Sequence, residues 1–89
     1  MAVNKLDQII NEQLLNVHMA VKTLQAMGLS VNSISIGNEY RPQILIAPGR
    51  ACKQLQSGYT KLINRSGRRV TERVAFVAEC QVKWEEISA

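Results

Sequence analysis

The feature that most constrains this chain is a two-residue alternation between Val70 and Trp84. Every even position from 74 to 84 is apolar, whereas most odd positions are polar; the apolar set is Val74, Phe76, Ala78, Cys80, Val82 and Trp84. A period of two buries one face of an extended segment and leaves the other face in water. The pattern therefore predicts one long, half-buried β-strand over 70–84, whose apolar face the rest of the chain must cover.

The N-terminal segment has the pattern of an amphipathic helix of about six turns. Its apolar residues recur at intervals of three or four: Leu6, Ile10, Leu14, Val17, Val21 and Leu24. Asn4 can cap the start of this helix, and Asp7 in the first turn suits the helix dipole. We expect Gly28 to end the helix in the left-handed conformation, so that Leu29 packs back on Leu24.

Two short strands and a second helix are predicted before the long strand. Residues 30–36 and 43–47 carry alternating isoleucines around a loop at 37–41, which predicts an antiparallel hairpin with Pro42 at the start of its second strand. Beyond Pro48 and Gly49, the apolar spacing predicts a helix over 51–63, although Gly58 weakens it. The residues in that spacing are Ala51 or Cys52, Leu55, Tyr59 and Leu62, and Ile63 widens the stripe.

The predicted element order is therefore α-β-β-α-β. The 89 residues suffice for one domain, 1–89, of the α+β class,. Two helices with one apolar stripe each can cover one face of a three-stranded, antiparallel-type sheet, which gives a two-layer sandwich with a long C-terminal strand. That strand would span roughly 50 Å, more than its neighbours can pair. Its surplus edge, or the helix faces, predicts association into a homodimer.

Membrane and secretory segments are not predicted. No apolar run approaches the ~18 residues of a membrane span, and residues 1–27 are amphipathic rather than a basic start followed by an apolar block. Cys52 and Cys80 belong to no CxxC motif and have no paired histidines. They are expected to be reduced core thiols of a cytoplasmic protein, with a disulfide or a metal site as the alternatives.

No catalytic, cofactor or metal site is predicted. His18 is the only histidine and flanks the apolar stripe of the first helix, and both cysteines lie on predicted core faces. The five glycines form no phosphate-binding loop,. The chain is therefore expected to bind a macromolecule rather than to act as an enzyme.

The net charge of +4 is concentrated in the middle of the chain, where eight cations oppose the single acid Glu72 between positions 41 and 73, a balance of +7. Five cations form a predicted basic corner at the start of the long strand: Lys61, Arg65, Arg68, Arg69 and Arg73. Alternation places Arg69 and Arg73 on the polar face of that strand and Arg68 opposite. This corner could bind an acidic protein surface or phosphates, or it could be a solvated corner that keeps the protein soluble.

Nucleic-acid binding is the alternative to protein binding for this corner. Few aromatic residues are available to stack on bases, and no helix-turn-helix, zinc-finger or RNP-like pattern occurs,. Tyr40 and Arg41 in the hairpin loop form a second candidate partner site, because tyrosine and arginine are enriched in binding hot spots. In the alternative interpretation, Tyr40 only covers the edge of the sheet.

Residues 29–47 carry a resemblance to a class of known proteins. The residues that carry it are Leu29, the Ile34 and Ile36 pair, Asn38, the Arg41-Pro42 pair and the Ile44 and Ile46 pair. With these residues, the stretch resembles small accessory proteins of temperate phages and prophages of enteric bacteria. Many such proteins are cytoplasmic, and some inhibit host enzymes or defence systems. The resemblance implies a host protein as partner and assigns no role to a particular residue.

Overall fold

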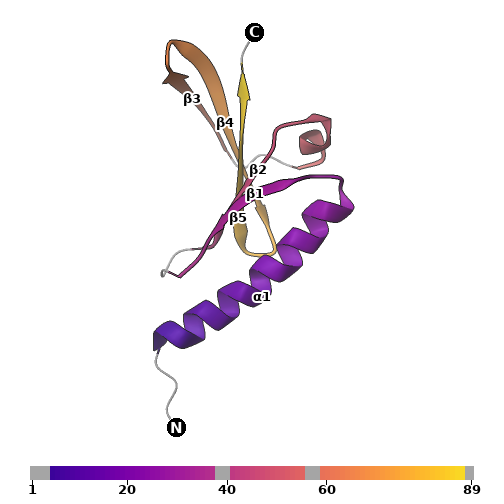
Figure 1. Ribbon diagram of the computed structural model, residues 1–89, viewed down its shortest axis with the longest axis vertical. Helices are drawn as coiled ribbons and strands as arrows, with labels where there is room; N and C mark the ends of the chain where they lie inside the picture. Colours follow the sequence, from indigo (N-terminus) through magenta and orange to yellow (C-terminus); the bar gives the residue numbers. More distant parts are fainter. Residues whose placement is uncertain (1–4, 38–40, 56–58, 88–89) are drawn as a thin grey trace.

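The computed structural model describes residues 5–37, 41–55 and 59–87, and it shows one long helix and a five-stranded sheet (Figure 1). The elements in chain order are α1 (Lys5–Ala26), β1 (Val31–Ser35), β2 (Gln43–Ile46), the 3₁₀ helix η1 (Arg50–Gln54), β3 (Tyr59–Arg65), β4 (Arg68–Val77) and β5 (Cys80–Ile87). The molecule is elongated, with extents of 56 × 28 × 19 Å. The predicted three-stranded sandwich with two helices is therefore wrong.

The sheet is mixed, with strand order β1-β2-β5-β4-β3. β1 and β2 form the predicted antiparallel hairpin, with a bulge between Val31 and Ser33. β2 runs parallel to β5, whereas β5, β4 and β3 are antiparallel neighbours. The hairpin from the middle of the chain is thereby joined to the C-terminal strand.

The predicted long strand is two strands joined by a two-residue turn. Val77 pairs with Cys80, and the turn residues Ala78 and Glu79 have φ values of 47° and 65°. Positive φ at both central residues is what a type I′ hairpin turn requires. Because the chain reverses there, odd residues of β4 share a face with even residues of β5, so Phe76 and Trp84 lie on opposite faces of the sheet.

The predicted second helix is also wrong. In the described part of this stretch only residues 50–54 are helical, as the short η1, and residues 59–65 form the edge strand β3. Here Leu62 and Ile63 point to opposite faces of a strand instead of sharing a helix stripe, because β3 pairs residue by residue with β4. The turn between them, Ser66 and Gly67, again has positive φ at both residues, 51° and 79°.

The first helix and its C-terminal cap are confirmed. Gly28 has a φ of 85°, the Leu29 amide donates to the Leu24 carbonyl at 3.0 Å, and the Gly28 amide donates to the Gln25 carbonyl at 3.0 Å. These are the two hydrogen bonds of a Schellman motif. Leu24 and Leu29 are both buried in the core, and the predicted N-cap residue, Asn4, lies outside the described residues.

The hydrophobic core lies between α1 and one side of the sheet, here named the helix face. Its buried members are Val17, Ala20, Leu24, Leu29, Ile44, Ile46, Cys52, Ala75, Cys80, Val82 and Trp84. Both described helices therefore pack on the same side of the sheet. The opposite side, named the open face, carries partly exposed residues such as Leu45 on β2 and Phe76 on β4.

Candidate functional site

A groove of about 810 Å³ lies on the described chain and is named the open-face groove, because most of its lining belongs to that side of the sheet. Its lining comes from β1 to β5: Asn32, Leu45, Ile46, Pro48, Arg65, Arg68, Val70, Glu72, Lys83, Trp84, Glu85 and Ile87. Half of these residues are apolar. Leu45 and Ile87 are 45% and 67% exposed, so the groove offers apolar surface to a partner.

Strand pairing explains the apolar part of this groove. Val70 on β4 lies directly between Ile63 on β3 and Ile87 on β5. Cross-strand neighbours on one face shield each other, and Val70 is only 5% exposed although neither described helix covers it. The three residues form an apolar row across the open face.

The rim of the groove carries charges of both signs, with three cations and two acids in its lining. Arg65 binds Glu85 through Nη2 at 2.6 Å and through Nε at 2.9 Å. Arg68 and Lys83 have no ion pair within the described part of the chain, and Arg68 is exposed. Two cations of the rim are therefore available to an acidic partner.

The basic corner predicted from the sequence is divided by the sheet. Register places Lys61, Arg65 and Arg68 on the open face, and Arg69 and Arg73 on the helix face. The pairing confirms that Arg69 and Arg73 share a face opposite Arg68, but the prediction that this face is the solvent-facing one is wrong, because the core packs against the same face. Only Arg65 and Arg68 of the five line the groove.

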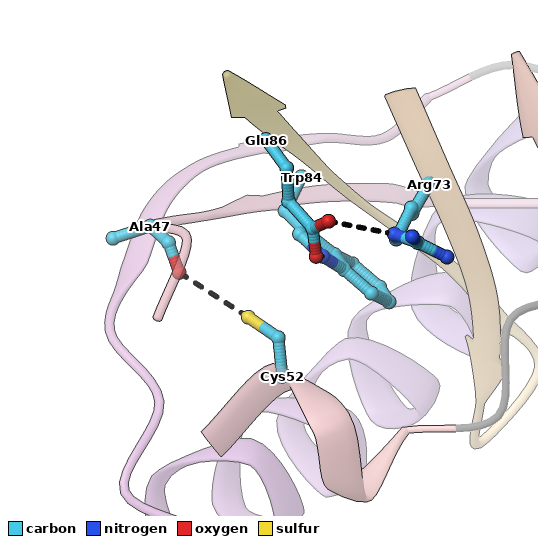
Figure 2. A network of polar contacts seen from close by, with 5 residues as sticks. All are labelled: Ala47, Cys52, Arg73, Trp84 and Glu86. Carbon is cyan, nitrogen blue, oxygen red and sulfur yellow. Dashed lines mark hydrogen bonds and ion pairs between the residues drawn. The ribbon is translucent and has the colours of Figure 1, made fainter. Parts of the chain in front are cut away.

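Arg73 is engaged in a polar network on the helix face (Figure 2). Its Nε donates to Glu86 Oε2 at 2.9 Å, and the indole Nε1 of Trp84 donates to Glu86 Oε1 at 3.1 Å. These two donors lower the pKa of Glu86 below its usual value of 4.5,. Arg73 and Glu86 also line a smaller pocket of about 290 Å³ beside η1.

The two cysteines are buried, unpaired thiols, as predicted. The Cys52 thiol donates to the Ala47 carbonyl at 3.6 Å (Figure 2). Burial raises the pKa of both thiols, so neither is an activated nucleophile,. Their role in the described structure is packing.

The second candidate site, in the hairpin loop, is described only in part, because Tyr40 lies outside the described residues. The Arg41 guanidinium carbon lies 5.1 Å from the centroid of the Phe76 ring, and Arg41 Nη1 lies 3.7 Å from Glu79 Oε2. Phe76, expected in the core, is 49% exposed beneath this cation. Arg41 thus covers the open face near the β4–β5 turn and is separate from the groove lining.

Sequence reasoning missed Leu45, Lys83 and Ile87 as parts of the site. Leu45 gave a weak signal, because it is the apolar residue between Ile44 and Ile46 and must face the other way in a strand,. Lys83 and Ile87 gave none, because their faces depend on the turn at 78–79.

The groove combines apolar and charged side chains in its lining. The ionisable residues among its described lining are Arg65, Arg68, Glu72, Lys83 and Glu85. Within residues 5–37, 41–55 and 59–87, no group of three or more histidine, cysteine or acidic residues is placed to hold a metal ion. Apolar side chains and arginine, which line this groove, are typical of protein interfaces,.

A family model with the description "Uncharacterised protein" matches residues 1–87. The chain belongs to this family. No curated protein and no solved structure matches the chain. Among the described residues, no helix has the length and hydropathy required to cross a membrane.

Proposed function

We propose that this protein is a non-enzymatic protein-binding module that holds its partner in the open-face groove. The observation that carries the proposal is an apolar groove of about 810 Å³ on the side of the sheet that neither described helix covers. Interfaces combine an apolar centre with a polar rim. Leu45, Val70 and Ile87 supply the apolar centre, and the charged residues supply the rim.

The charges favour a partner segment that presents an apolar anchor beside acidic residues. Arg68 and Lys83 are rim cations without an ion pair in the described chain, whereas of the two rim acids Glu85 is bound by Arg65 and Glu72 alone has no ion pair, so unpaired cations outnumber unpaired acids. An acidic side chain of the partner can therefore pair with Arg68 or Lys83 without displacing an internal ion pair. Arginine also forms bidentate hydrogen bonds with carboxylates.

A peptide library displayed on a surface tests this proposal. We expect enriched peptides to share a large apolar residue flanked by aspartate or glutamate. Binding is then measured with synthetic peptides by isothermal titration calorimetry. Arg68→Glu should weaken binding of these peptides, because it replaces a rim cation by an anion.

A matched pair of variants separates the groove from general exposed apolar surface. Ile87 and Leu62 are 67% and 68% exposed, but only Ile87 lines the groove. Ile87→Ser should lower peptide affinity by about tenfold or more, which corresponds to about 1.4 kcal/mol or more of lost apolar contact. Leu62→Ser should leave the affinity unchanged; equal losses for the two variants would contradict a groove-centred site.

Nucleic-acid binding is a second candidate function, favoured by the tip of the β3–β4 hairpin. The last β4–β5 pair is Val70 with Ile87, so the pairs Asn64–Arg69 and Arg65–Arg68 extend past β5 as a two-stranded ribbon. The major groove of DNA admits such a ribbon. Arg68 and Arg69 are exposed and form no ion pair among the described residues.

Arg69→Glu distinguishes the two functions, because Arg69 lies on the helix face of the ribbon, away from the groove lining. It should abolish DNA or RNA binding and leave peptide binding intact. Phosphate contacts also predict that affinity for duplex DNA falls with salt, with a log–log slope of about −0.9 per contact. Absence of DNA and RNA binding at low salt would remove this candidate.

The resemblance to phage and prophage accessory proteins adds that the partner would be a protein of the bacterial host. A cytoplasmic location would follow from that role. Both statements are predictions, supported by the resemblance over residues 29–47 alone.

A further inference from the structure

The outer surface of α1, on the side away from the sheet, carries a regular stripe of exposed residues. Its members are spaced by four, three, four, three and four positions: Gln8, Glu12, Leu15, Met19, Lys22 and Ala26. All six are exposed, and Leu15 and Met19 are 68% and 60% exposed. A 3-4 spacing keeps residues on one line along a helix and is the repeat by which helices pair.

The outer stripe is complementary to itself when it is reversed. Leu15 and Met19 lie two positions before and after Val17, and Glu12 and Lys22 lie five positions before and after it. Two helices can pair antiparallel about a two-fold axis that crosses the outer stripe at the level of Val17 along the helix. This arrangement places Leu15 beside Met19 of the partner subunit, and Glu12 beside Lys22 of the partner subunit. A parallel pair would place like charges together at both ends of the stripe, which is unfavourable.

We propose that a second copy of this chain docks on the outer stripe, so that two α1 helices pack antiparallel in a two-fold dimer. The two-fold operation matches opposite charges at both ends and apolar side chains between them, as an isologous interface requires. Glu12 and Lys22 form no ion pair in the part of the chain that the structure describes, so both are available.

The shape of the molecule permits this arrangement. α1 has 22 residues, and its N-terminal end extends beyond the sheet (Figure 1). The residues that bury α1 against the sheet, Val17, Ala20 and Leu24, lie on the other side of the helix from the stripe,. Pairing of the helices therefore places the two sheets on the outside of the dimer. Both open-face grooves stay free, so this inference stands or falls independently of the proposed function.

Sedimentation velocity on the full chain tests the dimer, over a concentration series at low ionic strength, where exposed ion pairs are least screened. We expect a concentration-dependent dimer of the unaltered chain. Glu12→Lys places lysine opposite lysine, and Lys22→Glu places glutamate opposite glutamate. Each variant alone should dimerise about tenfold more weakly, because two attractive pairs become two repulsive ones.

An equimolar mixture of the two charge variants is the decisive sample. One variant carries only cations at positions 12 and 22 and the other only anions, so they should form a heterodimer that is tighter than either homodimer. Gln25→Lys, which adds a cation to the same helix beside the stripe, should leave dimerisation unchanged. Leu15→Ala combined with Met19→Ala should abolish the dimer while retaining the helical circular dichroism signal, since alanine favours helix.

Two results would overturn the proposal. One is a chain that stays monomeric at millimolar concentration. The other is a dimer whose affinity does not respond to the charge variants or is not restored by mixing them, which would place the contact elsewhere, such as at the exposed edge of β3.

Discussion

Glu79 in the β4–β5 turn offers the sharpest test of the fold. It has a φ of 65°, and its side chain is exposed. Glu79 Oε2 forms an ion pair with Arg41 Nη1 at 3.7 Å. A left-handed backbone costs a residue with a Cβ atom roughly 1–2 kcal/mol and costs glycine almost nothing. Glu79→Gly should therefore relieve this conformational cost.

The matched control is Glu79→Ala, which removes the same ion pair but keeps the Cβ atom. An exposed ion pair contributes at most about 1 kcal/mol, and this loss is common to both variants. Glycine at position 79 should thus give a free energy of unfolding about 1 kcal/mol higher than alanine, after allowance for the greater entropy of the unfolded glycine chain. For a domain of this size, that difference shifts Tm by about 4–8 °C.

Thermal and urea unfolding of the two variants measures the difference. If residues 70–84 formed one continuous strand, glycine at position 79 would lie inside it and would be less stable than alanine by roughly 0.5–1 kcal/mol. The sign of the difference therefore separates the hairpin from the long strand. Alanine equal to or more stable than glycine would refute the turn.

Two further predictions concern titratable groups. The hydrogen bond from Arg73, followed by that from Trp84, lowers the pKa of Glu86 in the folded protein. Glu86 therefore contributes stability that is fully present above its usual pKa of 4.5 and is lost as the pH falls through the folded pKa,. In an acid titration followed by circular dichroism, the Glu86→Gln variant should lose less stability over that pH range than the unaltered chain. The Cys52 and Cys80 thiols, 2% and 0% exposed with raised pKa values, should react with Ellman's reagent at neutral pH only when the chain is unfolded; rapid labelling of the folded protein would contradict their burial.

Local signals in the sequence determined the N-terminal part of the fold. The spacing of Val17 and Leu24, the glycine at position 28 and the alternation in β1 and β2 each involve only a few neighbouring residues, and the structure confirms the helix, its cap and the hairpin that they predict. Helix periodicity and glycine at a positive φ depend on the local backbone, so they can be recognised without knowledge of the partner segments.

Tertiary pairing decided the C-terminal half. A period of two is the same for one long strand and for two strands joined by a two-residue turn, and Ala78-Glu79 contains none of the glycine, asparagine or proline that marks turns,. Residues 59–65 likewise fit a helix or a strand by spacing, and pairing with β4 selected the strand.

The candidate site, too, was predicted in part by the sequence and in part decided by the tertiary structure. Arginine-rich composition indicated that the region around Arg65 and Arg68 carries charge, and both line the groove. The groove itself is assembled from residues far apart in the chain, such as Leu45 and Ile87. Which side of a strand faces a groove depends on where the chain reverses, and that reversal is fixed by long-range backbone hydrogen bonds that no local stretch of sequence specifies.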